Sequence, residues 1–220
     1  MNAIIGMIQI IKMRGIPNNL INYFTKIDDA SHHMMHLIND ALDISDMEHG
    51  VFRLTNSNFN FHTMIENISR EIDNHASEKQ QTLKFKVDPA IPASLHGDEK
   101  RLRQAITALL ANAVKFSDEN SEIYFEGKLI GESEENMQND KISLQIEVTD
   151  NGIGISNEQQ AKLFNIFEQV DGSLSRKYGG IGAGLVLSKR IVEMMDGAIW
   201  LQSELGKGSS FFFTCKLRKG

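Results

Sequence analysis

An aspartate followed by two closely spaced glycines, DNGIGI at residues 150–155, ends an alternating apolar run at residues 142–148. A carboxylate at the end of a strand can accept hydrogen bonds from an exocyclic amine, and glycines let a flat base approach the backbone. The Asn-Gly pair alone is equally typical of a hairpin turn. Asp150, directly before the glycines, is therefore the residue that indicates a ligand.

Two further stretches contain residues suited to phosphate and metal binding. Asn112 and Lys115 are three positions apart on a predicted helix over residues 99–115, so they project from one side of it. An amide oxygen can bind a hard metal ion and an ammonium can pair with a phosphate, although a solvated polar edge of a core helix is the favoured explanation of this pair taken alone. The stretch GGIGAGL, residues 179–185, runs into another predicted helix, where free N–H groups suit a phosphate.

The order of these stretches is more informative than any one of them. A polar helix, an acid-glycine strand end, the aromatic segment LFNIFEQVDGS and a glycine loop before a helix follow one another along the chain. Together they indicate a site for a nucleotide with its phosphates.

The first part of the chain predicts a helical hairpin. We expect helices over residues 1–13 and 19–48, joined by the turn RGIPNN. The second helix repeats apolar residues at spacings of three and four, the pattern of a helix packed in a bundle or coiled coil. These residues are Leu20, Tyr23, Ile27, Ala30, Met34, Leu37, Ala41 and Ile44. We place a domain boundary between residues 1–49 and 50–220.

The second domain mixes strands and helices. We expect a short strand within residues 51–61, a helix over 62–81 and a strand over 82–88. After the helix at 99–115 we expect strands over 122–130 and 141–150. A helix over 184–197, closed by Gly197, and a hairpin of 198–203 with 209–217 end the chain. Antiparallel strands mixed with helices predict an α+β fold, a two-layer sandwich with helices on one sheet face.

The overall composition excludes several classes of protein. The net charge of −6 argues against nucleic-acid binding, because phosphates are neutralised by basic surfaces. A single cysteine, Cys215, favours a reducing compartment, and its alternating neighbours place it in a strand. The sequence has no apolar run of the roughly 20 residues that a membrane span requires. We expect a cytoplasmic domain, and the sequence leaves open whether its parent protein is anchored in the inner membrane.

These motifs resemble the catalytic core of a bacterial sensor histidine kinase of the hybrid type, along nearly the whole chain. GDEKRLRQAITALLANAVKFS is similar to the family's asparagine box, DNGIGI to its first glycine box, LFNIFEQVDGSLSRKYGG to its phenylalanine box and lid, and GGIGAGL to its second glycine box. SHHMMHLINDALDISDMEHGVFRL resembles the second helix of the dimerisation and phosphotransfer hairpin. The order and spacing do not fit Rossmann or P-loop sites.

The resemblance implies a Bergerat-type fold with a mixed sheet and an ATP site that also holds Mg²⁺. Asp150 would bind the adenine amino group and Asn112 the magnesium ion, with Lys115 along the phosphates and Phe116 against the base. The remaining implied ATP-binding residues are Gly152 and Gly154 beside the ring, Phe164 and Phe167 anchoring a lid, Arg176 as a weaker phosphate contact, and Gly180, Gly182 and Gly184 over the triphosphate. The implied partners are a receiver domain of a response regulator and a second copy of the hairpin, forming a homodimer.

The chain departs from the family at the phosphoacceptor. MNAIIG corresponds to the residues directly after the acceptor segment, so we expect this chain to lack the acceptor histidine and not to phosphorylate itself. His32, His33 and His36 remain in the second helix, and His32 and His36 have the spacing of a metal pair. No acid or proline follows them as an acceptor box requires, so surface or packing roles are the favoured interpretation.

Three residues of the nucleotide motifs also differ from the family. Ala108 stands four residues before Asn112 where the family has a polar residue, and Ile181 and Ala183 replace a Thr or Ser and a Leu in the second glycine box. A degenerate module that binds nucleotide without transferring phosphate is therefore the alternative interpretation. The hydrolysing gyrase, mismatch-repair and chaperone relatives carry a glutamate base where Ala108 stands, which argues against a hydrolase of that kind.

Overall fold

The computed structural model describes residues 6–8, 10–11, 15–17, 20–131, 140–164 and 183–220. The chain forms two compact units, Met1–Phe52 and Arg53–Gly220. In the first unit, helix α2 (Ile21–Glu48) is the helix that the heptad pattern predicts. Most of the first helix expected in the hairpin lies outside the described residues.

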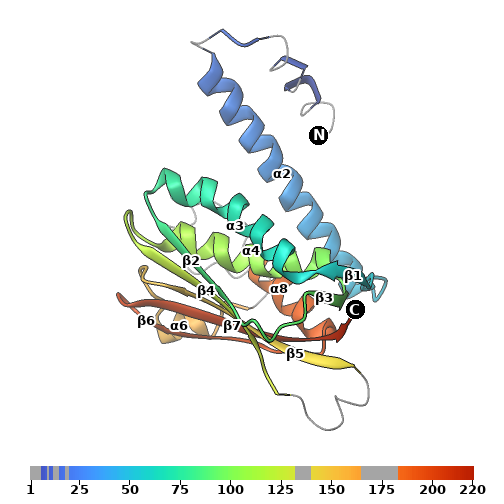
Figure 1. Ribbon diagram of the computed structural model, residues 1–220. Helices are drawn as coiled ribbons and strands as arrows, with labels where there is room; N and C mark the ends of the chain where they lie inside the picture. Colours follow the sequence, from blue (N-terminus) through green and yellow to red (C-terminus); the bar gives the residue numbers. More distant parts are fainter. Residues whose placement is uncertain (1–5, 9, 12–14, 18–19, 132–139, 165–182) are drawn as a thin grey trace. The chain divides into compact units, whose positions relative to one another are not determined.

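The second unit is built on a seven-stranded sheet (Figure 1). Its strand order is β1-β3-β7-β5-β4-β2, and β6 pairs with β7 beside this path. The strands are β1 (Ser57–Asn60), β2 (Thr82–Val87), β3 (Ser94–Gly97), β4 (Glu122–Leu129), β5 (Lys141–Asp150), β6 (Ile199–Glu204) and β7 (Gly208–Lys219). β2 runs parallel to β4 and the other pairs are antiparallel, so the sheet is mixed, as the resemblance implied.

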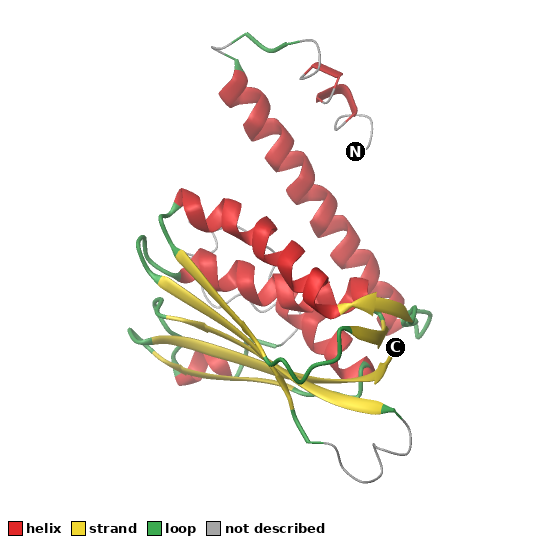
Figure 2. Cartoon of the chain, in the orientation of Figure 1, coloured by secondary structure: helices red, strands yellow, loops and turns green. Residues whose placement is uncertain are grey.

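Helices α3 (Phe61–Glu78), α4 (Glu99–Phe116) and α8 (Ala183–Met194) cover one face of this sheet (Figure 2). The alternation read from the sequence explains why. Ile142, Leu144, Ile146 and Val148 of β5 are buried beneath the helices, whereas the residues between them are only partly buried. α4 contributes the apolar stripe that covers this strand. The predicted α+β class with helices on one face is confirmed.

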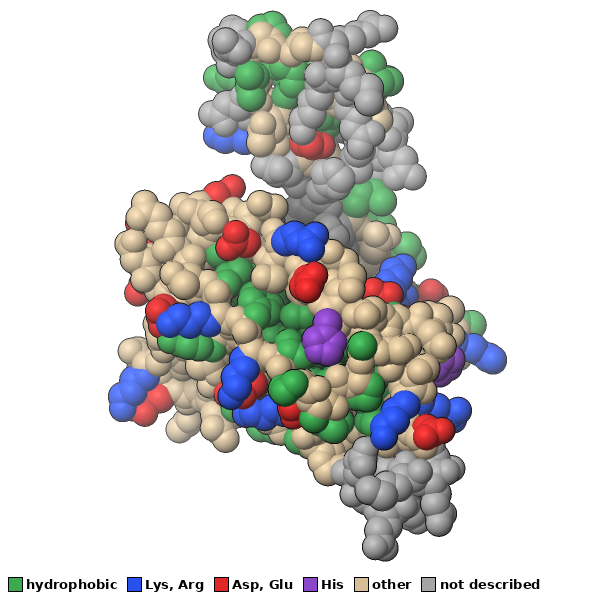
Figure 3. Space-filling model, viewed as in Figure 1, with side chains coloured by type: hydrophobic (Ala, Val, Ile, Leu, Met, Phe, Trp, Pro, Cys, Tyr) green, Lys and Arg blue, Asp and Glu red, His purple; other side chains and the backbone are tan. Residues whose placement is uncertain are grey.

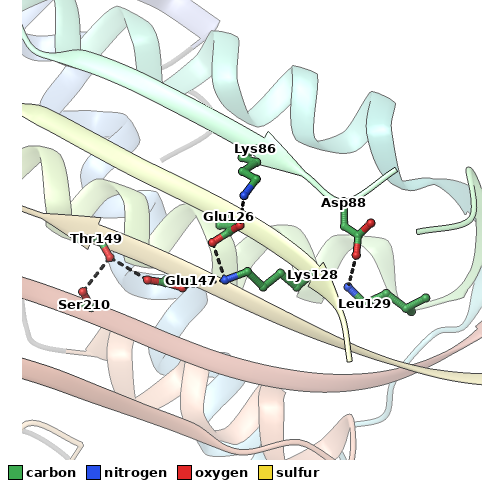
Figure 4. Close-up of polar contacts among 8 residues, drawn as sticks. All are labelled: Lys86, Asp88, Glu126, Lys128, Leu129, Glu147, Thr149 and Ser210. Atoms are coloured by element: carbon green, nitrogen blue, oxygen red, sulfur yellow. Dashed lines mark hydrogen bonds and ion pairs between the residues drawn. The ribbon is translucent and has the colours of Figure 1, made fainter. Parts of the chain in front are cut away.

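The opposite face of the sheet is polar where Figure 4 shows it, whereas Trp200 and Phe212 stack elsewhere on this face with their ring centres 5.5 Å apart. Glu126 of β4 forms ion pairs with Lys86 at 2.8 Å and with Lys128 at 2.6 Å. Thr149 and Ser210 share a hydrogen bond of 2.7 Å across β5 and β7. Paired charges and hydroxyl groups of this kind are stable in water, so this side does not require a second helical layer.

Four details of the expected secondary structure were wrong or incomplete. The first strand covers only Ser57–Asn60, and strand β3 (Ser94–Gly97) and the one-turn helix α6 (Asn157–Gln160) were not predicted. Gly197 does not supply the left-handed residue after α8, because Asp196 does so with a φ of 53°. Gly197 is instead required because a Cβ there would overlap the carbonyl of Thr214.

Cys215 is a buried residue of β7, as predicted. On the side of the molecule drawn in Figure 3, acidic and basic side chains lie interspersed among the residues that the structure describes. None of the described helices is long and apolar enough to cross a membrane.

Candidate functional site

Helix α4 carries the first candidate residues and is fixed at both ends. Asp98 caps its N-terminus, accepting the Arg101 N–H on Oδ1 at 3.0 Å and the Thr55 N–H on Oδ2 at 2.7 Å. The apolar stripe of the helix is fully buried against the sheet. Asn112 and Lys115, beside that stripe, are half-buried. The helix therefore presents both polar side chains at the edge of the core.

Asp150 is the last residue of β5 and points to the helical side of the sheet. Its side chain is only 5% exposed, and its Oδ1 accepts the Gly152 N–H at 2.8 Å. Burial raises the pKa of Asp150 above its usual value, while hydrogen bonds from the backbone N–H groups of Gly152 and Ser209 oppose this shift. A buried carboxylate with few donors is a good acceptor for an amine of a ligand.

The two glycines after Asp150 allow the backbone to pass very close to its neighbours. A Cβ on Gly152 would lie closer than 3.0 Å to the carbonyl of Phe116 and 2.9 Å from Asp150 Oδ1. Gly154 has a φ of 65°, which favours glycine, and a Cβ there would overlap the carbonyl of Glu204. Both positions exclude other residues on steric grounds.

The end of α4 meets the turn after Asp150. The Ile153 N–H donates to the carbonyl of Phe116 at 3.3 Å. The ammonium of Lys115 lies over the Phe116 ring, 4.9 Å from its centre, and burial lowers the pKa of Lys115. An anion bound beside this ammonium would offset the cost of its burial. Lys115, Phe116, Asp150 and Gly152, which are distant in sequence, therefore lie together.

The first turn of α8 lies against α4. A Cβ built on Gly184 would be 3.9 Å from the Cβ of Ala108. Asn112 is one helical turn beyond Ala108, on the same side of α4. The N-terminus of α8, which attracts anions, thus lies on the side of α4 that carries Asn112.

The remaining candidate residues are only partly described. Phe164 is half-buried, and the Lys189 ammonium of α8 lies 6.0 Å from the centre of its ring. Four candidates lie outside the described residues: Phe167, Arg176, Gly180 and Gly182. The departure Ile181 and the side chains of Ala183, His32, His33 and His36 are likewise outside them.

Three residues that support the site were not predicted. The Ser203 hydroxyl accepts the Ile155 N–H at 2.8 Å. Gln160 donates to the carbonyls of Ile155 at 2.7 Å and Ser203 at 3.0 Å. Ser209 pairs with Asp150 across the sheet. They fix the turn at residues 150–155, called the glycine turn below, to the β6–β7 hairpin. Part of this arrangement had a sequence signal, the capping box of Ser156 and Gln159 in α6.

The donor set limits which metal sites are possible. No cluster of three or more His, Cys, Asp or Glu side chains occurs among the residues that the structure describes. Asn112 offers a cation one neutral amide oxygen, so a cation bound there would also use oxygens of a ligand. Mg²⁺ usually keeps several such non-protein ligands.

Residues 97–219 match the family model described as "Histidine kinase-, DNA gyrase B-, and HSP90-like ATPase". The match covers more than half of the 220 residues, including α4, the glycine turn and α8. The chain belongs to this family. Proteins similar to it include a sensor protein and a hybrid histidine kinase.

Two of these kinases and one solved structure define the comparison. Sensor protein GacS of Pseudomonas syringae pv. syringae is 36% identical over 219 residues, covering 100% of this chain and 24% of GacS. Hybrid signal transduction histidine kinase B of Dictyostelium discoideum is 32% identical over 213 residues, covering 97% of this chain and 10% of that kinase. The crystal structure of full-length ShkA in complex with AMPPNP has a TM-score of 0.76 at 24% identity, covering 100% of this chain and 43% of ShkA.

The resemblance to sensor histidine kinases is thereby confirmed, and the chain contains the ATP-binding catalytic domain of this family. The chain spans about a quarter of the length of GacS and about a tenth of the length of hybrid kinase B. The likeness to ShkA, below 25% identity, shows the shared fold.

Proposed function

We propose that this chain binds ATP with Mg²⁺ and transfers the γ-phosphoryl group to a histidine, for relay to an aspartate of a receiver domain in a response regulator. The observation that carries the proposal is the junction of α4 with the turn after β5. There a buried carboxylate, a half-buried ammonium and an aromatic ring converge around glycine backbone that leaves space for no side chain. That combination suits the amine, phosphates and flat ring of a purine nucleotide.

Within this site we assign one role to each candidate. Asp150 accepts a hydrogen bond from the adenine amine, with Gly152 and Gly154 beside the base. Phe116 contacts the base and Lys115 pairs with the phosphates. Asn112 binds the magnesium ion, and the N-terminus of α8, including Gly184, faces the phosphates.

The remaining candidates extend this assignment over the phosphates. Phe164 and Phe167 anchor a lid, and Arg176, Gly180 and Gly182 contact the triphosphate from it.

Calorimetric titration with AMPPNP, with and without Mg²⁺, tests the binding step. We expect saturable binding that strengthens when Mg²⁺ is present, because the ion neutralises phosphate charge next to Asn112. Adenosine serves as the control ligand, since it lacks phosphates and should show no dependence on Mg²⁺. No heat with AMPPNP in either condition would contradict the proposal, and binding without a Mg²⁺ effect would favour the degenerate module.

We further propose that His32, His33 and His36 do not accept the phosphoryl group. Phosphoryl transfer requires an imidazole held in line with the γ-phosphate, with a neighbouring acid to take its proton, and the sequence after these histidines has no acceptor box. Incubation with radiolabelled ATP and Mg²⁺, followed by an acid-lability test, should yield no phosphohistidine on them. Stoichiometric acid-labile label on any of the three would contradict this assignment.

The proposed homodimer is supported by the exposed apolar side chains of α2. Tyr23, Ile27 and Met34 belong to the heptad seam and are all exposed in the single chain. A second copy of α2 is the partner that this spacing fits. The proposed location of the dimer is the cytoplasm. Sedimentation of the wild type and of Ile27→Lys tests the dimer, because a charge in the seam should favour the monomer. Identical sedimentation of both would contradict it.

A further inference from the structure

The C-terminal end of α4 is held from outside the helix. The last four carbonyls of a helix lack partners within it. In α4 the Ala113 carbonyl accepts the Ser117 N–H at 3.1 Å, and the Phe116 carbonyl accepts the Ile153 N–H at 3.3 Å. The two carbonyls between them, of Val114 and Lys115, accept hydrogen bonds from side chains that follow α3.

Lys79 supplies most of these bonds. Its Nζ donates to the carbonyls of Val114 at 2.8 Å, Lys115 at 2.9 Å and Ser117 at 3.3 Å. A lysine ammonium has three N–H donors, so all of them are used here. Its positive charge is also favourable at the negative end of the α4 dipole.

Gln81 supports the same helix end. Its side-chain amide donates to the carbonyls of Val114, Ser117 and Asp118, each at 3.1 Å, and it is only 6% exposed. Because all three partners are acceptors, the amide nitrogen must face them. Between Lys79 and Gln81 the backbone is left-handed, with a φ of 56° at Gln80.

We infer that Lys79 is a positioning residue of the nucleotide site, acting through the backbone of Lys115. Lys79 holds the Lys115 carbonyl in the last turn of α4, while the Ile153 N–H and the side-chain-free Gly152 contact the carbonyl of the next residue, Phe116. The backbone from which the Lys115 side chain extends is therefore held in place beside the turn after Asp150. This inference rests on the proposed function, because it assigns Lys79 to the site in which Lys115 binds phosphate.

Lys79→Met is the informative variant. It removes the donors and the charge but keeps a long apolar side chain, and Gln81 still holds the Val114 and Ser117 carbonyls. We expect AMPPNP–Mg²⁺ to bind about tenfold more weakly by calorimetry, the equivalent of one lost hydrogen bond to a charged group. Gln81→Met leaves the Lys79 bond to Lys115 intact and should weaken binding less than Lys79→Met does.

Asp98→Ala is the matched control for helix stability. It removes the cap at the opposite end of α4 and should leave the dissociation constant of AMPPNP within about twofold of the wild-type value. Urea unfolding places the variants on a common stability scale. If Asp98→Ala and Lys79→Met weaken AMPPNP binding equally, the effect is one of helix stability and the inference is overturned.

A double-mutant cycle tests the route through Lys115. In a Lys115→Met background, Lys79→Met should weaken AMPPNP binding by less than about threefold, because the ammonium that it positions is gone. Losses that simply multiply would overturn the inference.

Amide hydrogen exchange separates this inference from the proposed function. Lys79→Met should speed exchange at Ser117 and Ile153, whereas Asp98→Ala should not, and neither measurement requires nucleotide. A wild-type chain that fails to bind AMPPNP would refute the proposed function. Unchanged exchange in Lys79→Met would overturn the positioning role whether or not nucleotide binds.

Discussion

Replacing Gly152 by alanine tests the contact between the glycine turn and α4. The φ of Gly152 lies outside the left-handed region, so its backbone conformation is open to alanine. The added Cβ, however, would lie closer than 3.0 Å to the Phe116 carbonyl and 2.9 Å from Asp150 Oδ1. Since the first neighbour is backbone, rotating a side chain cannot relieve the overlap.

The expected cost follows from what must move. Overpacking of a rigid site costs about 1–3 kcal/mol. Separating the turn from α4 would also break the hydrogen bond from the Ile153 N–H to the Phe116 carbonyl, worth about 1 kcal/mol. We therefore expect Gly152→Ala to lower the free energy of unfolding by about 2–4 kcal/mol and to weaken adenosine binding more than about tenfold.

Urea unfolding followed by circular dichroism measures the first effect, and calorimetry with adenosine the second. Gly127→Ala is the matched control, because a Cβ at this buried glycine of β4 would meet its nearest neighbour, Ile146 Cδ1, at an ordinary 3.5 Å. It should change stability by less than about 1 kcal/mol and leave adenosine binding unchanged. If Gly152→Ala were as stable as Gly127→Ala and bound adenosine normally, the close contact would be irrelevant and the reasoning wrong.

Three further predictions concern single side chains. Asp150→Asn should bind adenosine much more weakly in calorimetry while remaining folded. Because burial raises the pKa of Asp150, the wild type should also lose stability as the pH rises from 3.8 through the higher folded pKa. Urea unfolding of Asp150→Asn should lack that loss. Asn112→Ala should lose the Mg²⁺-dependent part of AMPPNP affinity and keep its adenosine affinity; equal losses for both ligands would indicate a folding defect instead. Burial raises the pKa of Cys215 to about 12, so iodoacetamide should label it only through unfolding, and fast labelling of the folded chain would contradict its burial.

Local patterns predicted the parts of the fold that are local in the chain. The alternation in β5 identified its buried face, and the hairpins β4–β5 and β6–β7 join strands that are neighbours in sequence. β3 was missed because only Leu95 among its four residues is an apolar residue in the core. Its strand conformation depends on pairing with β1 and β7, which no local pattern reveals.

The candidate site divides in the same way. Asp150, Asn112 and Lys115 were identified because their residue types and positions on predicted elements indicate ligands. The supporting residues Ser203 and Lys79 were not, because a surface serine or lysine has the same appearance in a sequence whatever it contacts. Their roles depend on backbone groups brought close by the sheet and by the turn after α3.

The central position of β7 has a consequence for synthesis of the protein. This strand pairs with β3, β5 and β6, so residues 208–219 complete a sheet whose other strands come earlier in the chain. While β7 is still inside the ribosome, β5 presents an open edge with unpaired backbone groups. The sheet can therefore be completed only after its last strand has left the ribosome, and until then the edge of β5 is open to pairing with strands of other chains.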